Sequence, residues 1–202
     1  MKQVLIGSTN QGKILEVKRF LGDLSIDWLN LCDIAPNIEV DENRPDFEGN
    51  AVKKAVEISR ATQMATLAAD GGMVVPALGG WPGVRSRRFD TQVEHTDEEV
   101  IEIFKNKIRT LGSKERKFEF HTVFAFVELG RQPVVGRGVL SGDITLELHP
   151  LAQPGFPYRR FWWLPKFHKY FLDLTDLEYD QANHNGHALR KLRPAIERYI
   201  HD

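Results

Sequence analysis

A short polar segment near the start of the chain, Ser8-Thr9-Asn10-Gln11-Gly12-Lys13, carries the residue types that bind phosphate. It follows the apolar run Lys2–Gly7, which predicts a buried strand, and apolar residues recur at helical spacing from Ile14 onward. The segment therefore joins a strand to a helix N-terminus, where backbone N–H groups and the helix dipole favour an anion. We expect a phosphate-binding loop whose donors are Ser8, Thr9, Asn10 and the ammonium of Lys13.

The same loop has a simpler interpretation. Its spacing is neither that of a Walker loop nor that of a GxGxxG fingerprint. Thr9 or Asn10 also fits an ordinary helix N-cap, and Lys13 then becomes a solvated helix residue. The loop alone leaves both interpretations open.

Two acidic residues, Glu42 and Asp70, are candidates for holding a metal ion. Glu42 lies in a predicted loop before an amphipathic helix over Phe47–Thr62. Asp70 lies where a strand predicted over residues 66–75 is interrupted by Asp70-Gly71-Gly72, and these glycines leave room for a ligand. Mg²⁺ takes one or two carboxylates together with substrate phosphates and water. Two carboxylates from separate loops therefore predict a magnesium–nucleotide site, although each acid alone is more typical of a solvated turn.

Further candidates lie on the long helix and near the C-terminus. Lys53 and Lys54 are helix lysines, most of which are solvated. The aromatic residues of Gly155-Phe156-Pro157-Tyr158 can stack on a base, an interaction of about 1–3 kcal/mol, or plug the core under a loop. Asn183-His184-Asn185 offers donors and acceptors for a base edge, or an N-cap with an incidental histidine.

The elements that must position these residues alternate between strand and helix. Further strands are predicted over residues 26–31, 118–129 and 134–148, further helices over 97–111 and 186–200, and loops over 33–45 and 151–165. The alternation predicts an α/β fold, a central mixed sheet with long antiparallel strands flanked by helices. With 202 residues, 42% of them hydrophobic, the chain suffices for one compact domain with a small lobe.

Composition excludes several classes of function. The net charge of −1 is spread along the chain, so no nucleic-acid polymer is implied as a partner. Cys32 is the single cysteine, which excludes intrachain disulfides and four-cysteine zinc sites. We see no signal peptide and no apolar run of about 18 residues. We therefore expect a cytoplasmic protein with no membrane association.

Together and in this order, the segments resemble the inosine triphosphate pyrophosphatase family, the Ham1-like nucleotide phosphatases. The family pattern T/S-x-N-x-x-K-x-x-E fits the first loop, and E-x-x-x-x-F-x-E-N-A-x-x-K-A matches at Glu42, Phe47, Asn50, Ala51, Lys54 and Ala55. The pattern D-D-S-G-L-x-V-x-A-L-G-G-x-P-G-V matches at Asp70, Gly72, Met73, Val75 and Ala77-Leu78-Gly79-Gly80-Trp81-Pro82-Gly83-Val84. Two later motifs, G-F-G-Y-D-P and S-H-R-G-x-A-L, are met in part.

The resemblance implies a nucleoside triphosphate pyrophosphohydrolase that converts NTP and water to NMP and pyrophosphate. It implies a catalytic set of Asp70, Lys54 and Glu42, with Mg²⁺ held by Glu42 and Asp70. The triphosphate would be clamped by Ser8, Thr9, Asn10, Lys13 and Lys54, and the base bound by Phe156, Tyr158, Asn183, His184 and Asn185. It also implies one ITPase-like domain over residues 1–202, with two lobes and a cleft between them, in a homodimer.

The departures from the family patterns concentrate at the site. Ala69 replaces the first acid of D-D-S-G, Arg159 replaces an aspartate, Tyr179 a lysine and Asn185 an arginine. The phosphate half is thus mostly kept and the base half rewritten, while Ala69 is expected to weaken the metal half. Three hypotheses follow: a pyrophosphatase with altered base preference, an enzyme for another phosphorylated small molecule, or a catalytically impaired paralog that binds a nucleotide or a protein partner.

Overall fold

A seven-stranded mixed sheet organises the chain in the computed structural model, which describes residues 1–89 and 93–202. The strand order is β2-β1-β3-β4-β5-β6-β7, and β1 is parallel to both β2 and β3. Strand β6 is antiparallel to β5 and β7, and β4 and β5 are neighbours joined by a turn too short for a crossover. The strands are β1 (Lys2–Gly7), β2 (Ile26–Asn30), β3 (Thr66–Val74), β4 (Lys117–Val127), β5 (Val134–Ile144), β6 (Trp162–Leu164) and β7 (Lys169–Tyr170).

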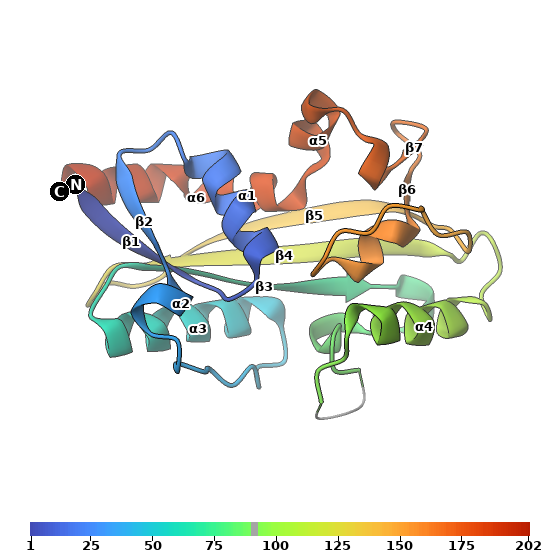
Figure 1. The fold of residues 1–202 in the computed structure, drawn as a ribbon, viewed down its shortest axis with the longest axis horizontal. Helices are drawn as coiled ribbons and strands as arrows, with labels where there is room; N and C mark the ends of the chain where they lie inside the picture. Colours follow the sequence, from blue (N-terminus) through green and yellow to red (C-terminus); the bar gives the residue numbers. More distant parts are fainter. Residues whose placement is uncertain (90–92) are drawn as a thin grey trace. The chain divides into compact units, whose positions relative to one another are not determined.

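Helices flank this sheet, so the predicted α/β class is confirmed (Figure 1). The α-helices within the described residues are α1 (Gln11–Leu21), α2 (Leu31–Ile34), α3 (Phe47–Thr62), α4 (Asp97–Ile108), α5 (Asp176–Ala182) and α6 (His184–His201). Short 3₁₀ turns cover Pro76–Leu78, Gly83–Arg85, Pro157–Phe161 and Phe171–Asp173. Helix α3 has the predicted bounds, and its first turn is capped by the Asp46 carboxylate, which accepts from the Gly49 N–H at 2.6 Å.

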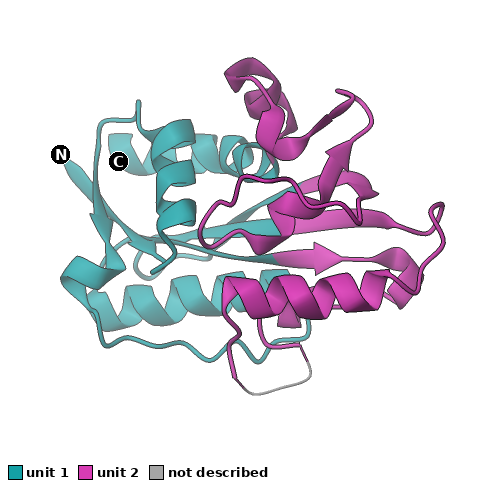
Figure 2. Cartoon of the chain, turned by 45° about the vertical axis from the view of Figure 1, so that its right-hand side comes forward, with its two compact units in different colours: residues 1–71, 122–138, 184–202 teal, residues 72–121, 139–183 magenta. Residues whose placement is uncertain are grey.

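The chain divides into two compact units (Figure 2). Unit 1 consists of Met1–Gly71, Thr122–Gly138 and His184–Asp202, and unit 2 of Gly72–His121 and Val139–Asn183. The single domain with a cleft between two lobes stays a prediction.

Unit 1 has helices on both faces of its strands, α1 and α6 on one face and α3 on the other (Figure 1). Residues of β3 alternate between these faces. Ala69 packs in the apolar cluster with α1 and α6, whereas Ala68 packs against Ala51 and Ala55 of α3. The alternation places Asp70 on the face that α3 covers.

Close backbone packing fixes the start of α6 within unit 1. A Cβ atom at Gly138 of β5 would lie 1.9 Å from the carbonyl oxygen of His184, so only glycine permits this approach. A Cβ at Gly136 would similarly lie 2.1 Å from the carbonyl oxygen of Ala188, one turn further along. The backbone of α6 therefore rests directly on β5.

Unit 2 has its own aromatic core around α4. Phe104 makes edge contacts with Tyr158 and Phe161, each with ring centroids 5.0 Å apart. Trp162 of β6 stacks on Phe118 of β4 at 5.1 Å. Such ring pairs add packing energy to the burial of large rings, so Tyr158, Phe161 and Trp162 belong to the core of unit 2.

The structure corrects three predictions about the elements. Strand β3 continues through Asp70-Gly71-Gly72 as far as Val74, next to β4 in the sheet, although its pairing with β1 ends at Ala68. The predicted loop over residues 151–165 contains a 3₁₀ turn and β6. The predicted loop over residues 33–45 begins inside the short helix α2, and α5 was not predicted.

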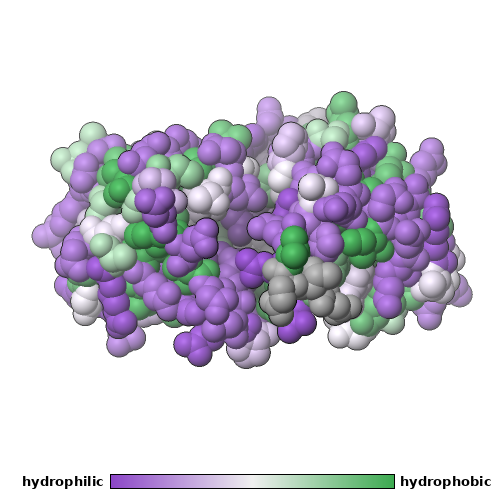
Figure 3. All heavy atoms as spheres, turned by 60° about the horizontal axis from the view of Figure 1, so that its bottom comes forward, coloured by the Kyte–Doolittle hydropathy of each residue, from purple (hydrophilic) through white to green (hydrophobic). Residues whose placement is uncertain are grey.

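The face of the molecule on which α3 lies is mostly hydrophilic, with hydrophobic residues in small separate groups (Figure 3). Among the described residues, no helix combines the length and apolar character needed to cross a membrane.

Candidate functional site

The predicted phosphate loop forms a capped helix start. Asn10 has extended backbone angles, and its side-chain oxygen accepts from the N–H groups of Gly12 and Lys13, at 2.9 and 3.3 Å. The Ser8 hydroxyl oxygen accepts from the Asn10 N–H at 3.2 Å. The Asn10 cap therefore uses two N–H groups that we expected to face a phosphate, and Thr9 is exposed.

Lys13 gives this loop a charge directed toward β3. Its Nζ donates to the carbonyl oxygen of Ala69 at 3.3 Å, and the side chain is partly buried. The ammonium is therefore held next to Asp70 rather than in bulk solvent. A cation in this place can neutralise a phosphate bound beside Asp70.

Asp70 is a buried carboxylate in the middle of β3, with 6% of its surface exposed. Its Oδ1 accepts from the Gly71 N–H at 2.8 Å, and its Oδ2 accepts from the Asn50 side-chain amide at 3.1 Å. Burial raises the pKa of Asp70, and the charge of Glu42 raises it further, while Lys54, Lys13 and the Asn50 hydrogen bond oppose the rise. Because these charges act on Asp70, the four ionisable side chains form one electrostatic cluster.

Glu42 is held by the long helix α3. The Nζ of Lys54 donates to Glu42 Oε1 at 2.6 Å, with 14% and 31% of the two side chains exposed. The neighbouring Lys53 donates to the Asp41 carbonyl oxygen at 2.6 Å and to Asn43 Oδ1 at 3.1 Å. Both lysines therefore hold the acidic segment over residues 41–43.

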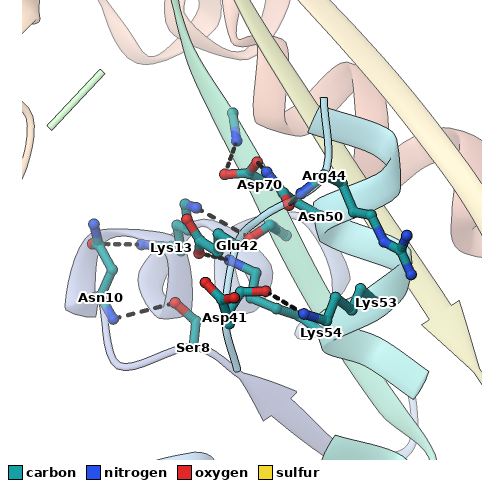
Figure 4. Close-up of polar contacts among 12 residues, drawn as sticks. Ser8, Asn10, Lys13, Asp41, Glu42, Arg44, Asn50, Lys53, Lys54 and Asp70 are labelled. Carbon is teal, nitrogen blue, oxygen red and sulfur yellow. Dashed lines mark hydrogen bonds and ion pairs between the residues drawn. The ribbon is translucent and has the colours of Figure 1, made fainter. Parts of the chain in front are cut away.

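Figure 4 shows this cluster, in which the segment with Glu42 crosses in front of α3 and β3. Among residues 1–89 and 93–202, no group of three or more histidine, cysteine or acidic side chains could hold a metal ion by itself. A pair of carboxylates suits a hard cation that completes its shell with phosphates and water, as Mg²⁺ does. The donors Glu42 and Asp70 therefore fit Mg²⁺ with a phosphorylated substrate.

Ala69 does not remove an acid from this cluster, contrary to the expectation from sequence. Its side chain is 2% exposed and lies in the apolar cluster with α1 and α6, on the other face from Asp70. An aspartate at position 69 would point into that apolar cluster. The carboxylates on the α3 side are thus unaffected by this departure.

The predicted base-binding aromatics of unit 2 have different environments. Phe156 is half-buried, and the guanidinium of Arg159 lies 3.8 Å from its ring centroid. Tyr158 is buried, its hydroxyl donates to the Ser86 carbonyl oxygen, and burial raises its pKa. The structure therefore gives Tyr158 a packing role, and only Phe156 keeps a partly exposed ring.

Two departures from the family patterns, Arg159 and Tyr179, contact each other. Arg159 is 1% exposed, and its Nη1 donates to Gln153 Oε1 at 2.7 Å and to the Tyr179 hydroxyl at 3.4 Å. Its guanidinium also faces the ring of Phe171, at 4.9 Å, as well as that of Phe156. The rewritten positions form one connected cation–aromatic cluster.

The three predicted readers of a base edge are almost fully buried. Asn183, His184 and Asn185 are 0%, 1% and 3% exposed. Asn183 ends α5 in unit 2, and His184 and Asn185 begin α6 in unit 1. Asn183 is the C-cap residue of α5 and directly precedes α6, so the N-cap considered from sequence stays a prediction. Their role toward a base stays a prediction.

Two residues beside this cluster are not singled out as site residues by the sequence. Asn50 stands there only as part of a family pattern, and Lys53 has the features of a solvated helix lysine. A signal for Asn50 was available, since asparagine is a poor helix former and this one stands among apolar positions of an amphipathic helix. Lys53 offered no comparable signal.

The fold and this cluster define an α/β protein with a buried acid, a second acid and two lysines beside a strand–helix loop. Comparison with known proteins gives its family: the chain belongs to the Ham1 family, whose model matches residues 4–195.

Named relatives cover nearly the whole chain. A dITP/XTP pyrophosphatase of Bacillus anthracis is 30% identical over 202 residues, covering 99% of this chain and 98% of that protein. A dITP/XTP pyrophosphatase of Lactiplantibacillus plantarum is 32% identical over 197 residues, covering 97% and 95%. The solved structure of a HAM1 protein from Coxiella burnetii aligns with a TM-score of 0.84 at 26% identity, covering 98% of this chain and 100% of that one.

Proposed function

We propose that this protein is a nucleoside triphosphate pyrophosphohydrolase, which adds water across the α–β phosphoanhydride bond and releases NMP and pyrophosphate. The observation that carries the proposal is the cluster around Asp70, a buried carboxylate influenced by Lys54, Lys13 and Glu42. Relatives over nearly the full chain bear the name dITP/XTP pyrophosphatase, which supports the same reaction class.

In the proposed mechanism, Glu42 and Asp70 would hold Mg²⁺, which would supply charge neutralisation for the phosphates and help to activate the attacking water. Lys13 and Lys54 bind the triphosphate oxygens as point charges, and Ser8, Thr9 and Asn10 add hydroxyl and amide contacts. Asp70, with 6% of its surface exposed, would accept a hydrogen bond from the attacking water and take up its proton. Positive charge around the leaving pyrophosphate favours its departure.

We propose that the base preference differs from that of the family. The cation of Arg159 covers one face of Phe156, the ring proposed to stack on the base, at 3.8 Å. Polar groups built for one base edge reject other bases, often by several orders of magnitude, and here those groups have changed. The protein should therefore lack a strong preference for inosine and xanthosine triphosphates over ATP and GTP.

The decisive measurement is pyrophosphate release from ITP, XTP, ATP and GTP at identical Mg²⁺, with kcat/KM for each. Release from any of these nucleotides by the wild type, absent in Asp70→Asn, supports the pyrophosphohydrolase. No turnover, accompanied by nucleotide binding in calorimetry, would favour the impaired paralog, for which the buried Asn183, His184 and Asn185 are an argument.

The base preference has its own comparison. The double variant Arg159→Asp, Tyr179→Lys restores the family residues at two positions that contact each other. It should raise the ratio of kcat/KM for ITP over ATP, while the Mg²⁺ requirement stays that of the wild type. A large ITP preference already present in the wild type would refute altered specificity.

We also propose a cytoplasmic homodimer in which residues 1–202 act as one ITPase-like domain. Its mass in solution, measured by light scattering, tests the dimer.

A further inference from the structure

Asn50 is a fully buried polar side chain in the first part of α3, with 0% of its surface exposed. Asparagine disfavours a helix interior, and a buried amide costs free energy unless its hydrogen bonds are made. The next buried positions on this helix, Ala51 and Ala55, are apolar. Asn50 therefore needs an explanation beyond helix formation.

Both ends of the Asn50 amide are used, and they join three segments of unit 1. Its Nδ2 donates to Asp70 Oδ2 at 3.1 Å, and its Oδ1 accepts from the Arg44 N–H at 2.9 Å (Figure 4). Asp70 lies on β3, and Arg44 lies two residues after Glu42. One side chain thus connects the buried acid to the segment that carries the second acid.

Helix α3, which carries Asn50, is held in place by its packing and its cap. Helix α3 packs on the sheet through Ala51, Ala55 and Ile58, and the Asp46 cap fixes its first turn. Lys54 follows Asn50 by four residues, so the two side chains share one face of the helix. One reaches Asp70 and the other reaches Glu42.

We propose that Asn50 is a positioning residue that fixes the carboxylate of Asp70 relative to Glu42, so that both face the same Mg²⁺–nucleotide. This proposal rests on the proposed function, because it assigns Asn50 a role in that reaction. The Nδ2 bond occupies one lone pair of Oδ2 and sets the plane of the carboxylate, while the Oδ1 bond sets the path of the chain next to Glu42. Asn50 does not touch substrate in this proposal and acts through Asp70.

The test is Asn50→Leu, which keeps the branching at Cγ and removes both hydrogen bonds. Partners that orient metal ligands typically change metal affinity or activity by about 10–100-fold when they are removed. We expect kcat to fall and the dissociation constant of Mg²⁺, measured by calorimetry on the free protein, to rise within that range, with KM for the nucleotide at saturating Mg²⁺ nearly unchanged. Asn50→Ala removes the same bonds with a smaller side chain and serves if the leucine variant does not fold.

The matched control is Ser59→Ala, on the same helix. Ser59 is 2% exposed, and its Oγ donates to the Met64 carbonyl oxygen at 2.6 Å. This variant also loses a buried hydrogen bond of α3, so it should lose stability while kcat and the dissociation constant of Mg²⁺ stay at wild-type values.

Each outcome has one meaning. If the wild type hydrolyses nucleotides and folded Asn50 variants match its kcat and its dissociation constant of Mg²⁺, the positioning role is refuted and the proposed function stands. If Ser59→Ala loses as much kcat as Asn50→Leu, the effect is one of stability and the positioning role is likewise refuted. If the wild type hydrolyses no nucleotide, the proposed function fails and the positioning role fails with it.

Discussion

If Glu42 is a metal ligand, as proposed, Lys54 competes with the metal ion for it, so removing the charge of Lys54 should have opposite effects on metal binding and on turnover. Its Nζ lies 2.6 Å from Glu42 Oε1, and the two side chains are 14% and 31% exposed. An exposed ion pair contributes about 0.2–1 kcal/mol, whereas breaking a buried one costs about 3–5 kcal/mol. This half-buried pair falls between these limits, at about 1–3 kcal/mol. Lys54→Met should therefore tighten metal binding to the free protein by about 5- to 150-fold.

Turnover should move in the other direction. The variant lacks a cation that neutralises charge on the bound triphosphate, so kcat/KM for the nucleotide falls. Metal affinity is measured by titrating the free protein with Mn²⁺, followed by electron paramagnetic resonance, and with Mg²⁺ by calorimetry. Pyrophosphate release gives kcat/KM on the same preparations.

Lys53→Met is the matched control, because it changes the net charge by the same amount on the same helix. Lys53 donates to the Asp41 carbonyl oxygen and to Asn43, so its loss loosens the acidic segment without freeing Glu42. Metal affinity should stay unchanged or weaken in this variant. Unchanged or weaker metal affinity in Lys54→Met as well would refute the reasoning, since Glu42 would then not be a ligand for which Lys54 competes.

Three further results are expected. Asp70→Asn should lower kcat by roughly 10²–10⁴-fold, the range for a lost proton acceptor, with a folded circular-dichroism spectrum; full activity would remove Asp70 from the mechanism. Gly138→Ala forces a Cβ to 1.9 Å from the His184 carbonyl oxygen, so overpacking of about 1–3 kcal/mol should lower Tm by roughly 2–12 °C. Gly112→Ala is the control, because its added Cβ meets only a flexible carboxylate. A Tm of Gly138→Ala that equals the Tm of this control would contradict the packing. Hydrogen bonds from Lys169 and the Thr175 backbone lower the pKa of Glu178 from 4.5 to about 2. The ionised carboxylate therefore contributes fully to the free energy of unfolding above pH 4.5, and this contribution is lost as the pH falls toward 2. Glu178→Gln should show a smaller loss of Tm on acidification than the wild type.

Elements whose apolar residues recur with one clear spacing could be predicted from sequence. Lys2–Gly7 and Phe47–Thr62 have the predicted bounds because each has an unbroken apolar pattern and an evident end. β6 escaped prediction, since its short run is recognisable only through pairing with β5 and β7. The break expected at Asp70-Gly71-Gly72 was wrong, because β3 stays extended to Val74, beyond Ala68, the last residue that pairs with β1.

That one error about β3 explains an error about the site. A predicted strand that continues through Asp70 places Ala69 and Asp70 on opposite faces of the sheet, because side chains alternate along a strand. Ala69 would then have been expected in the apolar cluster, where the structure has it. The residue types that could bind phosphate and metal were evident from sequence, whereas the connections made by Asn50 and Lys53 depend on tertiary contacts.

The location of the departures supports the proposal that base recognition is altered while the reaction is kept. The hydrogen bonds that hold Asp70 and Glu42 come from Gly71, Asn50 and Lys54, all within unit 1. Arg159 and Tyr179 lie within unit 2 and contact each other. Substitutions confined to that cluster alter the surroundings of Phe156 without breaking a bond to either acid. The sequence differences from the family at these two positions therefore argue for altered specificity more strongly than for lost catalysis.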